Sequence, residues 1–547
     1  MDAVEWVGVL AACGAAATAL VVRDARVRAA AMVLALALAP ALVAGDLWDT
    51  ERFRDLRDSP MQLLALAVVA AIGISLLTAV ILRWPAALPL LAFGVLAFRI
   101  PVELGGETSN LLIPLYLVIA SGTAATAIAT YQFRGALRSR GGGAWMAPRG
   151  RSPHALTSPA EMLARLRVLR RGVVEGMSLP ELAATLLPWL LAGFLVLYAI
   201  QSAYSSDLSK ATETVSFFFV PFAVLLALLL QVRWTSNLLT ALFAIVFCEG
   251  LLFVGVGVWQ FATRELFWNP TVIAGNEVHT YFRVNSLFWD PNVLGRYLVL
   301  AALAATAYML WTRHKERAIA AAAGCIVLLV GLTLSFSQSS ILALLAGLLA
   351  LVVLRWGLRW GIVGGAVIAI ASGALVLAGG VKPTSSESLE VRSSGRVSLI
   401  TGGLELAEDR PLHGYGSGSF QSEFAQRYLD VDEKEGAAIS HSEPITVAAE
   451  QGAVGLLLYG ALVLAGLGAL VGAAPLIPAP RGALVACFVA MVVHSLAYAG
   501  FLIDPVTWAL LGVGLSLARG PLPSPLAERA PHPAAEAAPP RPRVQAA

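Results

Sequence analysis

The chain has 547 residues, of which 58% are hydrophobic and only 13% are charged, and its formal net charge is +3. Soluble globular domains carry about 25% charged residues, so this composition excludes a soluble protein with a polar surface. Apolar runs of about 20 residues recur along most of the sequence, and each could cross the hydrocarbon layer as a helix. The alternating pattern of transmembrane strands does not occur. We therefore predict an all-α polytopic integral membrane protein, a bundle of about 12–15 transmembrane helices.

The predicted spans follow one another from the first residues to the region before the C-terminal tail. Their centres lie near residues 13, 37, 72, 93, 121, 192, 223, 249, 302, 328, 347, 370, 458, 493 and 512. The segment Met1 to Glu5 lacks a basic stretch, so we interpret the first run as a span and not as a cleaved signal peptide. The last run, Pro505 to Ala518, is short and could form a tight hairpin with the span before it.

Two long polar segments divide the spans into three groups. The predicted divisions are N-terminal helices in 1–133, a basic cytoplasmic loop in 134–181, helices in 182–380 with an outer loop at 261–291, a long periplasmic loop in 381–444, C-terminal helices in 445–518 and a disordered cytoplasmic tail in 519–547. Within the basic loop, residues 134–151 are rich in Gly and Arg, and 159–176 could form an amphipathic helix on the membrane surface. The tail is rich in Pro and Ala, which is typical of disorder.

Lysine and arginine concentrate in alternate loops, and this pattern predicts the orientation of the chain. With the N-terminus outside, the inner segments hold most of these residues, among them Arg23, Arg28 and the run Arg313 to Arg317. The protein is then expected in the inner (plasma) membrane, with its functional face in the periplasm. The cytoplasmic arginine excess favours anionic membrane lipids. Nucleic acid is not expected as a partner, because the basic residues are scattered and lack interleaved aromatic residues.

The periplasmic loop 381–444 is the segment in which function is expected. It contains a predicted helix at 386–408, a turn-rich stretch at 410–418 and a second predicted helix at 420–428. Long loops with their own secondary structure are usually functional. The outer loop 261–291 is also dense in polar and aromatic residues, so we expect the site where the two loops meet.

Three residues at the predicted outer face stand out: Arg283, Arg396 and His441. A single interfacial arginine is commonly a snorkelling residue, so only the set is informative. Guanidinium groups bind phosphate oxygens bidentately and can neutralise a diphosphate leaving group. Histidine has an ordinary pKa suited to deprotonate an acceptor hydroxyl near pH 7. The set is therefore sufficient to displace a lipid diphosphate from the C1 carbon of a sugar.

A secondary set of polar residues accompanies these three. It comprises Asn292, His413, Arg410 and Gln338. His413 is most simply a turn residue, and Arg410 could simply pair with Asp409. His494 lies within a predicted span, where an ionisable residue is a functional hypothesis by default. The cysteines sit in apolar runs, and no cluster of Asp, Glu and His at the predicted outer face has metal-ligand spacing. We therefore predict no metal and no cofactor.

Several short motifs follow one another in a fixed order in the second half of the chain. They are Arg-Val-Asn-Ser-Leu-Phe-Trp-Asp-Pro-Asn at 283–292, Leu-Ser-Phe-Ser-Gln-Ser-Ser at 334–340, Gly-Arg at 395–396, Glu-Asp-Arg-Pro-Leu-His-Gly-Tyr-Gly-Ser-Gly at 408–418, His-Ser-Glu at 441–443, Ala-Glu-Gln-Gly-Ala-Val-Gly at 449–455 and Asp-Pro-Val-Thr-Trp at 504–508. Their order and predicted topology resemble the O-antigen ligase / O-antigen polymerase (Wzy-like) superfamily of membrane glycosyltransferases.

That resemblance implies an inverting, metal-independent transfer from an undecaprenyl-diphosphate-linked glycan to a glycan or lipid acceptor hydroxyl in the periplasm. Arg283 and Arg396 match family arginines that contact the diphosphate, and His441 matches the histidine that activates the acceptor. Other polysaccharide-assembly proteins are implied partners. The sequence departs from the family at Ser442, where Asn is common, and at Gln338, where Arg is common.

The sequence leaves other functions open. Polymerase and ligase use the same kind of donor and differ mainly in the acceptor, so the sequence does not separate them. A transporter or flippase would carry broken spans with ionisable residues at the midplane, whereas here these residues concentrate outside. An inactive partner in an envelope-glycan complex would keep the scaffold and not use the site residues.

Overall fold

The computed structural model is an all-α bundle, as predicted. It describes residues 3–46, 54, 58–104, 107–139, 178–278, 280–378, 396–428, 440–472 and 478–524. Within these ranges, 12 helices are long and apolar enough to cross a membrane. The apolar runs fold as helices because a helix satisfies its backbone hydrogen bonds internally, as the hydrocarbon layer requires. The predicted fold class is confirmed.

Helices make up almost all of the described chain, and one pair of short strands interrupts them. In chain order, the elements are α1 (Ala3–Val21), α2 (Ala25–Asp46), α4 (Pro60–Arg83), α5 (Ala87–Val95), β1 (Ile100–Leu104), β2 (Glu107–Leu111), α6 (Ile113–Ser139), α8 (Leu179–Gln201), η1 (Ser202–Tyr204), α9 (Leu208–Thr214), η2 (Val215–Phe219), α10 (Val220–Leu229), α11 (Ser236–Thr263), α12 (Pro270–Val278), α13 (Pro291–Trp311), α14 (Lys315–Ser335), α15 (Gln338–Trp356), α16 (Leu358–Ala378), α18 (Arg396–Asp409), α19 (Phe420–Tyr428), α20 (Glu443–Gly472), α21 (Pro478–Ser495) and α22 (Pro505–Arg519).

The N-terminal part of the bundle is built around α10. Every residue of α10 is buried, and it packs against α1, α2, α6 and α22. A helix that is apolar on all sides is stable only when neighbouring helices surround it. The two strands β1 and β2 pair antiparallel as a hairpin between α5 and α6.

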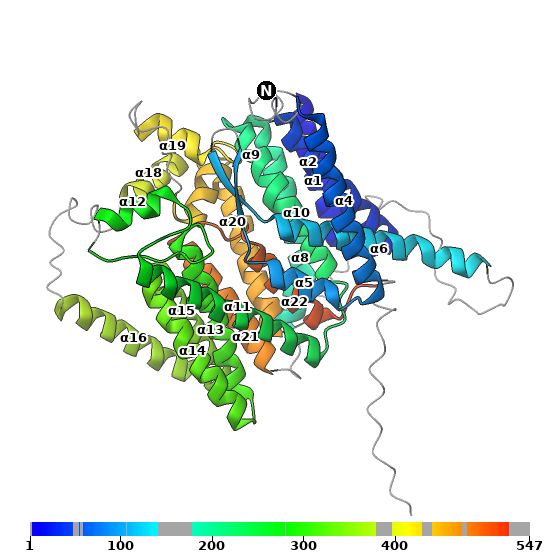
Figure 1. The fold of residues 1–547 in the computed structure, drawn as a ribbon. Helices are drawn as coiled ribbons and strands as arrows, with labels where there is room; N and C mark the ends of the chain where they lie inside the picture. The colour runs from blue at the N-terminus through cyan, green and yellow to red at the C-terminus, as the bar shows by residue number, and fades with distance from the viewer. Residues whose placement is uncertain are drawn as a thin grey trace, which may run out of the picture.

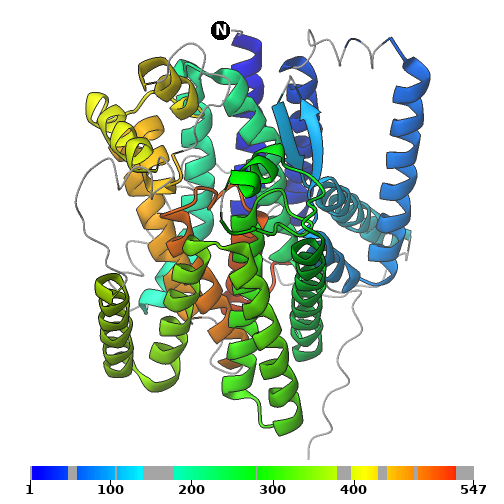
Figure 2. The same cartoon turned by 60° about the vertical axis from the view of Figure 1, so that its left-hand side comes forward.

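The C-terminal part contains the helices that position the site. α13 packs against α14, α15 and α21, and α20 packs along α8; Figure 2 shows this part of the bundle from a second direction. Gly295 allows the close approach of α13 and α15, because an added Cβ would lie 2.6 Å from the Ser340 Oγ atom. The first turns of α13 and α15 are therefore in contact.

The span predicted near residue 93 is wrong. The structure has there only the nine-residue helix α5, followed by the β1–β2 hairpin. The apolar run between Pro85 and Arg99 is shorter than the 20 or so residues that a span needs. The run after Pro505 forms the single helix α22, which packs inside the bundle against α10.

The helices of the two predicted outer loops lie at one end of the bundle. α12, α18 and α19 are near the end that carries the N-terminus, and the α13–α14 turn lies at the opposite end (Figure 1). The helix predicted at 420–428 is confirmed as α19. The helix predicted at 386–408 is observed from Arg396 onward, and its earlier part lies outside the described residues. So do most of the basic loop, including 159–176, and the tail beyond residue 524.

Candidate functional site

Polar residues at the first turns of α13 and α15 form a hydrogen-bonded cluster. The Asp290 Oδ1 atom accepts from Asn292 N at 2.6 Å and caps α13. Ser337 caps α15, its Oγ accepting from Ser340 N at 3.4 Å. The Ser337 hydroxyl also donates to Asn292 Oδ1 at 2.9 Å. Capping therefore fixes both helix starts and joins them to each other.

Arg283 lies beside this cluster and is half-buried. Its backbone exchanges two hydrogen bonds with the Asn276 side chain of α12, Arg283 N donating at 2.9 Å and Arg283 O accepting at 3.0 Å. The guanidinium donates to Ser335 O at 3.2 Å and to Asn292 Oδ1 at 3.4 Å. No acidic side chain in the described part of the chain forms an ion pair with it. The positive charge of Arg283 is therefore available to an anion.

Buried serines of α15 connect the cluster to α21. The Ser337 Oγ atom lies 2.7 Å from Ser340 Oγ and 3.3 Å from Ser339 Oγ. The Ser339 hydroxyl lies 3.2 Å from the Nε2 atom of His494. All four side chains are buried. Buried hydroxyl groups that satisfy one another are held in fixed positions, so His494 is connected to the side of the site that carries Arg283.

Tyr498, in the connection between α21 and α22, links His494 to His441. Its ring centroid lies 5.6 Å from that of His494 and 5.8 Å from that of His441. Burial raises the pKa of the Tyr498 hydroxyl, the nearby Asp290 carboxylate raises it further, and the Arg296 guanidinium opposes this rise. Tyr498 is therefore a neutral phenol at pH 7, and it stands between the arginine side and the histidine side of the site.

The backbone holds His441 in a fixed turn immediately before α20. His441 has a φ of 55°, in the left-handed region. On either side of it, the Ser440 hydroxyl donates to Ser442 O at 2.9 Å and accepts from Ser442 N at 3.1 Å. One residue later, the Glu443 carboxylate accepts from Gly500 N at 2.8 Å and from Phe501 N. This anchor ties the connection that carries Tyr498 to the start of α20.

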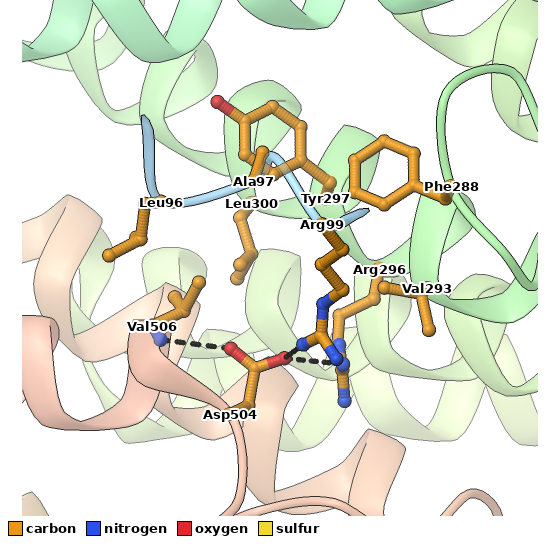
Figure 3. Close-up of a pocket in the computed structure, with 10 residues that line it drawn as sticks. All are labelled: Leu96, Ala97, Arg99, Phe288, Val293, Arg296, Tyr297, Leu300, Asp504 and Val506. Atoms are coloured by element: carbon orange, nitrogen blue, oxygen red, sulfur yellow. Dashed lines mark hydrogen bonds and ion pairs between the residues drawn. The ribbon is translucent and has the colours of Figure 1, made fainter. Parts of the chain in front are cut away.

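Two arginines converge on one carboxylate deeper in the bundle (Figure 3). Asp504 forms ion pairs with Arg296, and with Arg99 at 3.5 Å, and its other oxygen accepts from Val506 N at 2.9 Å to cap α22. Arg296 follows Asn292 by one helical turn, so both lie on the same face of α13. The cavity at this cluster measures about 20 Å³, which is room for a single water molecule. The cluster is therefore structural in this conformation.

We predict that Asp504→Asn destabilises the fold strongly. The Asp504 side chain is only 6% exposed, and its loss would leave two guanidinium groups without their common counter-charge. Breaking a buried ion pair by removing one partner costs about 3–5 kcal/mol. The measurement is the midpoint of thermal unfolding of the purified protein in detergent. The matched control is Asp409→Asn, which removes an exposed ion pair with Arg427 and should have a much smaller effect. Equal shifts in both variants would contradict the structural role of Asp504.

The structure brings some of the predicted residues together and describes others elsewhere. Arg283 and Asn292 are in hydrogen-bond contact, and the serines, His494 and Tyr498 connect them to His441. Arg396 is the first residue of α18, and its side chain lies outside the described residues. Gln338 is exposed, whereas its neighbours Ser337 and Ser339 are buried in the cluster.

His413 and Arg410 lie in a different place, the glycine-rich stretch between α18 and α19. His413 is exposed, its ring stands edge-on to that of Tyr204 at 5.8 Å, and its carbonyl accepts from the Tyr204 hydroxyl at 2.7 Å. The Arg410 guanidinium lies over the Tyr415 ring at 4.1 Å. Asp409 forms its ion pair with Arg427 and not with Arg410. These contacts fit a structural role for both residues.

The glycine-rich stretch is bound to the kinked part of α20. Gly418 N and Phe420 N donate to the Glu450 carboxylate at 2.9 and 3.2 Å, and Gly416 N donates to Glu450 O at 2.8 Å. Gly452 has a φ of 64° and interrupts the helix. An added Cβ there would meet the Leu412 backbone at 2.4 Å, so only glycine fits. The motifs at 408–418 and 449–455 thus form a scaffold that fixes the helix following His441.

Sequence reasoning missed several members of the site. Tyr498 was not singled out, and Ser339 and Ser340 appeared only inside a motif. The structural cluster of Arg99 and Arg296 with Asp504 also escapes the sequence, because an arginine at the end of a span is commonly a snorkelling residue. A polar residue next to a capped helix start carries no distinctive spacing, and the contacts that unite these residues join segments up to 405 positions apart in the chain. Besides the motifs that contain Arg283, Asn292 and His441, the position of His494 within a predicted span was a signal that pointed to this network.

The fold and the site define a polytopic membrane protein with a buried polar network between its helices. The family model of the O-antigen ligase matches residues 323–460. This match confirms the resemblance to the O-antigen ligase / Wzy-like family, and it covers the serine cluster and His441. It supports a ligase- or polymerase-type role in polysaccharide assembly. No curated protein sequence matches the chain.

Proposed function

We propose that the protein is a membrane glycosyltransferase that transfers a glycan from an undecaprenyl-diphosphate donor to an acceptor hydroxyl at the periplasmic face. The observation that carries this proposal is the network that connects Arg283 to His441. No acidic residue in the described part of the chain forms an ion pair with Arg283. An anion-binding group and a base on opposite sides of one fixed polar cluster suit displacement of a diphosphate by a hydroxyl.

The proposed reaction is a single inverting displacement. The acceptor oxygen bonds to the sugar C1 carbon while the bond between C1 and the diphosphate oxygen breaks, and the diphosphate leaves with the electron pair. His441 takes the acceptor proton as general base. Arg283, together with Arg396 of the neighbouring loop, neutralises the charge that develops on the diphosphate. These residues supply both functions without a metal ion.

A cavity beside Arg283 and a groove beside the Asp504 cluster suit the parts of a lipid-linked glycan. A cavity of about 470 Å³ in the outer loop is lined by Asn276, which holds the Arg283 backbone, and by aromatic and charged residues such as Tyr281 and Glu277. Such a lining suits a sugar. An apolar groove of about 290 Å³ runs between α11, α13, α21 and α22 and shares Tyr297 and Val506 with the arginine cluster. Such a groove suits a hydrocarbon chain.

The test is a deletion strain analysed for lipid-linked glycans. Accumulation of single repeat units is expected for a polymerase, and accumulation of a lipid-linked polymer is expected for a ligase. Wild-type protein should restore the product, and variants at Arg283, Arg396 and His441 should not. Accumulation on the cytoplasmic face of the membrane would instead indicate a flippase. Rescue by all three variants would indicate an inactive assembly partner.

A further inference from the structure

A further cavity lies at the end of the bundle opposite to the candidate site. It measures about 510 Å³. The lining residues come from the ends of α1 and α22, from α8 and from the chain just after α10 and α22. None of these lining residues is acidic.

The chain that follows α22 is fixed against the bundle and closes one wall of this cavity. Leu522 N donates to Leu230 O at 2.8 Å. The fully buried Arg28 guanidinium donates to Pro523 O, and also to Val22 O at 3.2 Å. The cavity is thus a built feature with hydrogen-bonded walls.

The charge at this cavity is positive. Arg23 and Arg519 are both exposed, and they are close enough to repel each other. The buried Arg28 interacts with the nearby Asp24 carboxylate, so the charge at the opening comes from Arg23 and Arg519. The nearest acidic residue in sequence, Asp24, is engaged in capping α2, where its carboxylate accepts from Arg26 N at 2.9 Å. In the part of the chain that the structure describes, neither Arg23 nor Arg519 forms an ion pair, and two such guanidinium groups at one opening suit a phosphate group.

The remaining surface of the cavity is apolar and suits acyl chains. Leu20, Leu230 and Leu515 provide aliphatic walls, and the Trp189 ring is of the type that is enriched at the membrane interface. A free phosphate ion would use the arginines and leave these walls in contact with water. A phospholipid uses both parts of the cavity.

From these observations we propose that the cavity binds an anionic phospholipid from the leaflet opposite to the candidate site, with its phosphate between Arg23 and Arg519 and an acyl chain against the apolar walls. In the predicted orientation this is the cytoplasmic leaflet. The proposal does not depend on the transfer reaction.

The test uses the full-length protein in nanodiscs that contain equal amounts of phosphatidylglycerol and phosphatidylcholine, and native mass spectrometry counts the lipids that stay bound after release. The wild type should retain phosphatidylglycerol over phosphatidylcholine by at least about tenfold, since each arginine near an anionic surface contributes a several-fold preference. The double variant R23Q/R519Q should lose this preference. The matched control R313Q/R317Q removes the same charge from the region of the α13–α14 turn, away from the cavity. This control should keep the preference for phosphatidylglycerol.

A second variant separates the lipid from a free ion and guards against misfolding. Thr185→Trp fills the half-buried cavity wall without removing charge, so it should also lose the retained lipid. If millimolar inorganic phosphate displaces the phospholipid and Thr185→Trp has no effect, the arginines bind only an ion. That result would overturn the proposal. Equal retention of both lipids by the wild type, or an equal loss in R313Q/R317Q, would overturn it as well.

Discussion

Replacement of His441 by alanine is expected to abolish the glycan product while the protein stays in the membrane. General-base catalysis contributes about 10²–10⁴-fold to a rate, and His441 is the imidazole that the network connects to Arg283 through Tyr498 and His494. The measurement is the amount of polymerised or ligated glycan in the complemented deletion strain, with the membrane level of the variant followed by immunoblot.

Two further variants make the test of His441 specific. His441 has a positive φ, which alanine adopts only with strain, whereas asparagine tolerates it. His441→Asn therefore keeps the turn, removes the base and should be equally inactive. His413→Ala alters an exposed histidine of the same loop and should be active. A normal amount of glycan in the His441→Asn strain would show that His441 is not the general base.

The second large effect is expected for Arg283→Lys. Lysine keeps the positive charge but lacks the planar fork that binds phosphate oxygens in pairs. It also cannot reproduce the two simultaneous contacts of the guanidinium with Ser335 O and Asn292 Oδ1. Loss of one donor to a developing negative charge typically lowers the rate about 10²–10³-fold. The measurement is the rate of glycan transfer in membranes supplied with the lipid-linked donor.

Arg427→Lys is the matched control for this variant. Arg427 lies in α19 at the same end of the bundle, where its exposed guanidinium pairs with Asp409 and lies 5.8 Å from the centre of the Tyr428 ring. Its replacement should leave the transfer rate within a few-fold of the wild type. Unchanged activity of Arg283→Lys would mean that Arg283 serves only the fold or the topology.

The sequence alone determined the class of the fold and most of its spans. Hydrophobicity over about 20 residues is a local property, and the bilayer leaves a helix as the main way to satisfy the backbone. The same reasoning failed near residue 93, where the apolar run ends at Arg99 and the chain turns back as a hairpin. The motifs also directed attention to Arg283, Asn292 and His441, which the structure connects.

Only the tertiary structure decided how these residues are connected and which of their neighbours take part. The serines of α15 became members of the site because Gly295 lets α13 approach them. Tyr498 lies at the centre of the site because Glu443 holds the α21–α22 connection next to the turn at His441. These contacts form between helices that are distant in sequence. Burial and hydrogen bonding fix their geometry, and neither leaves a periodic signal in the chain.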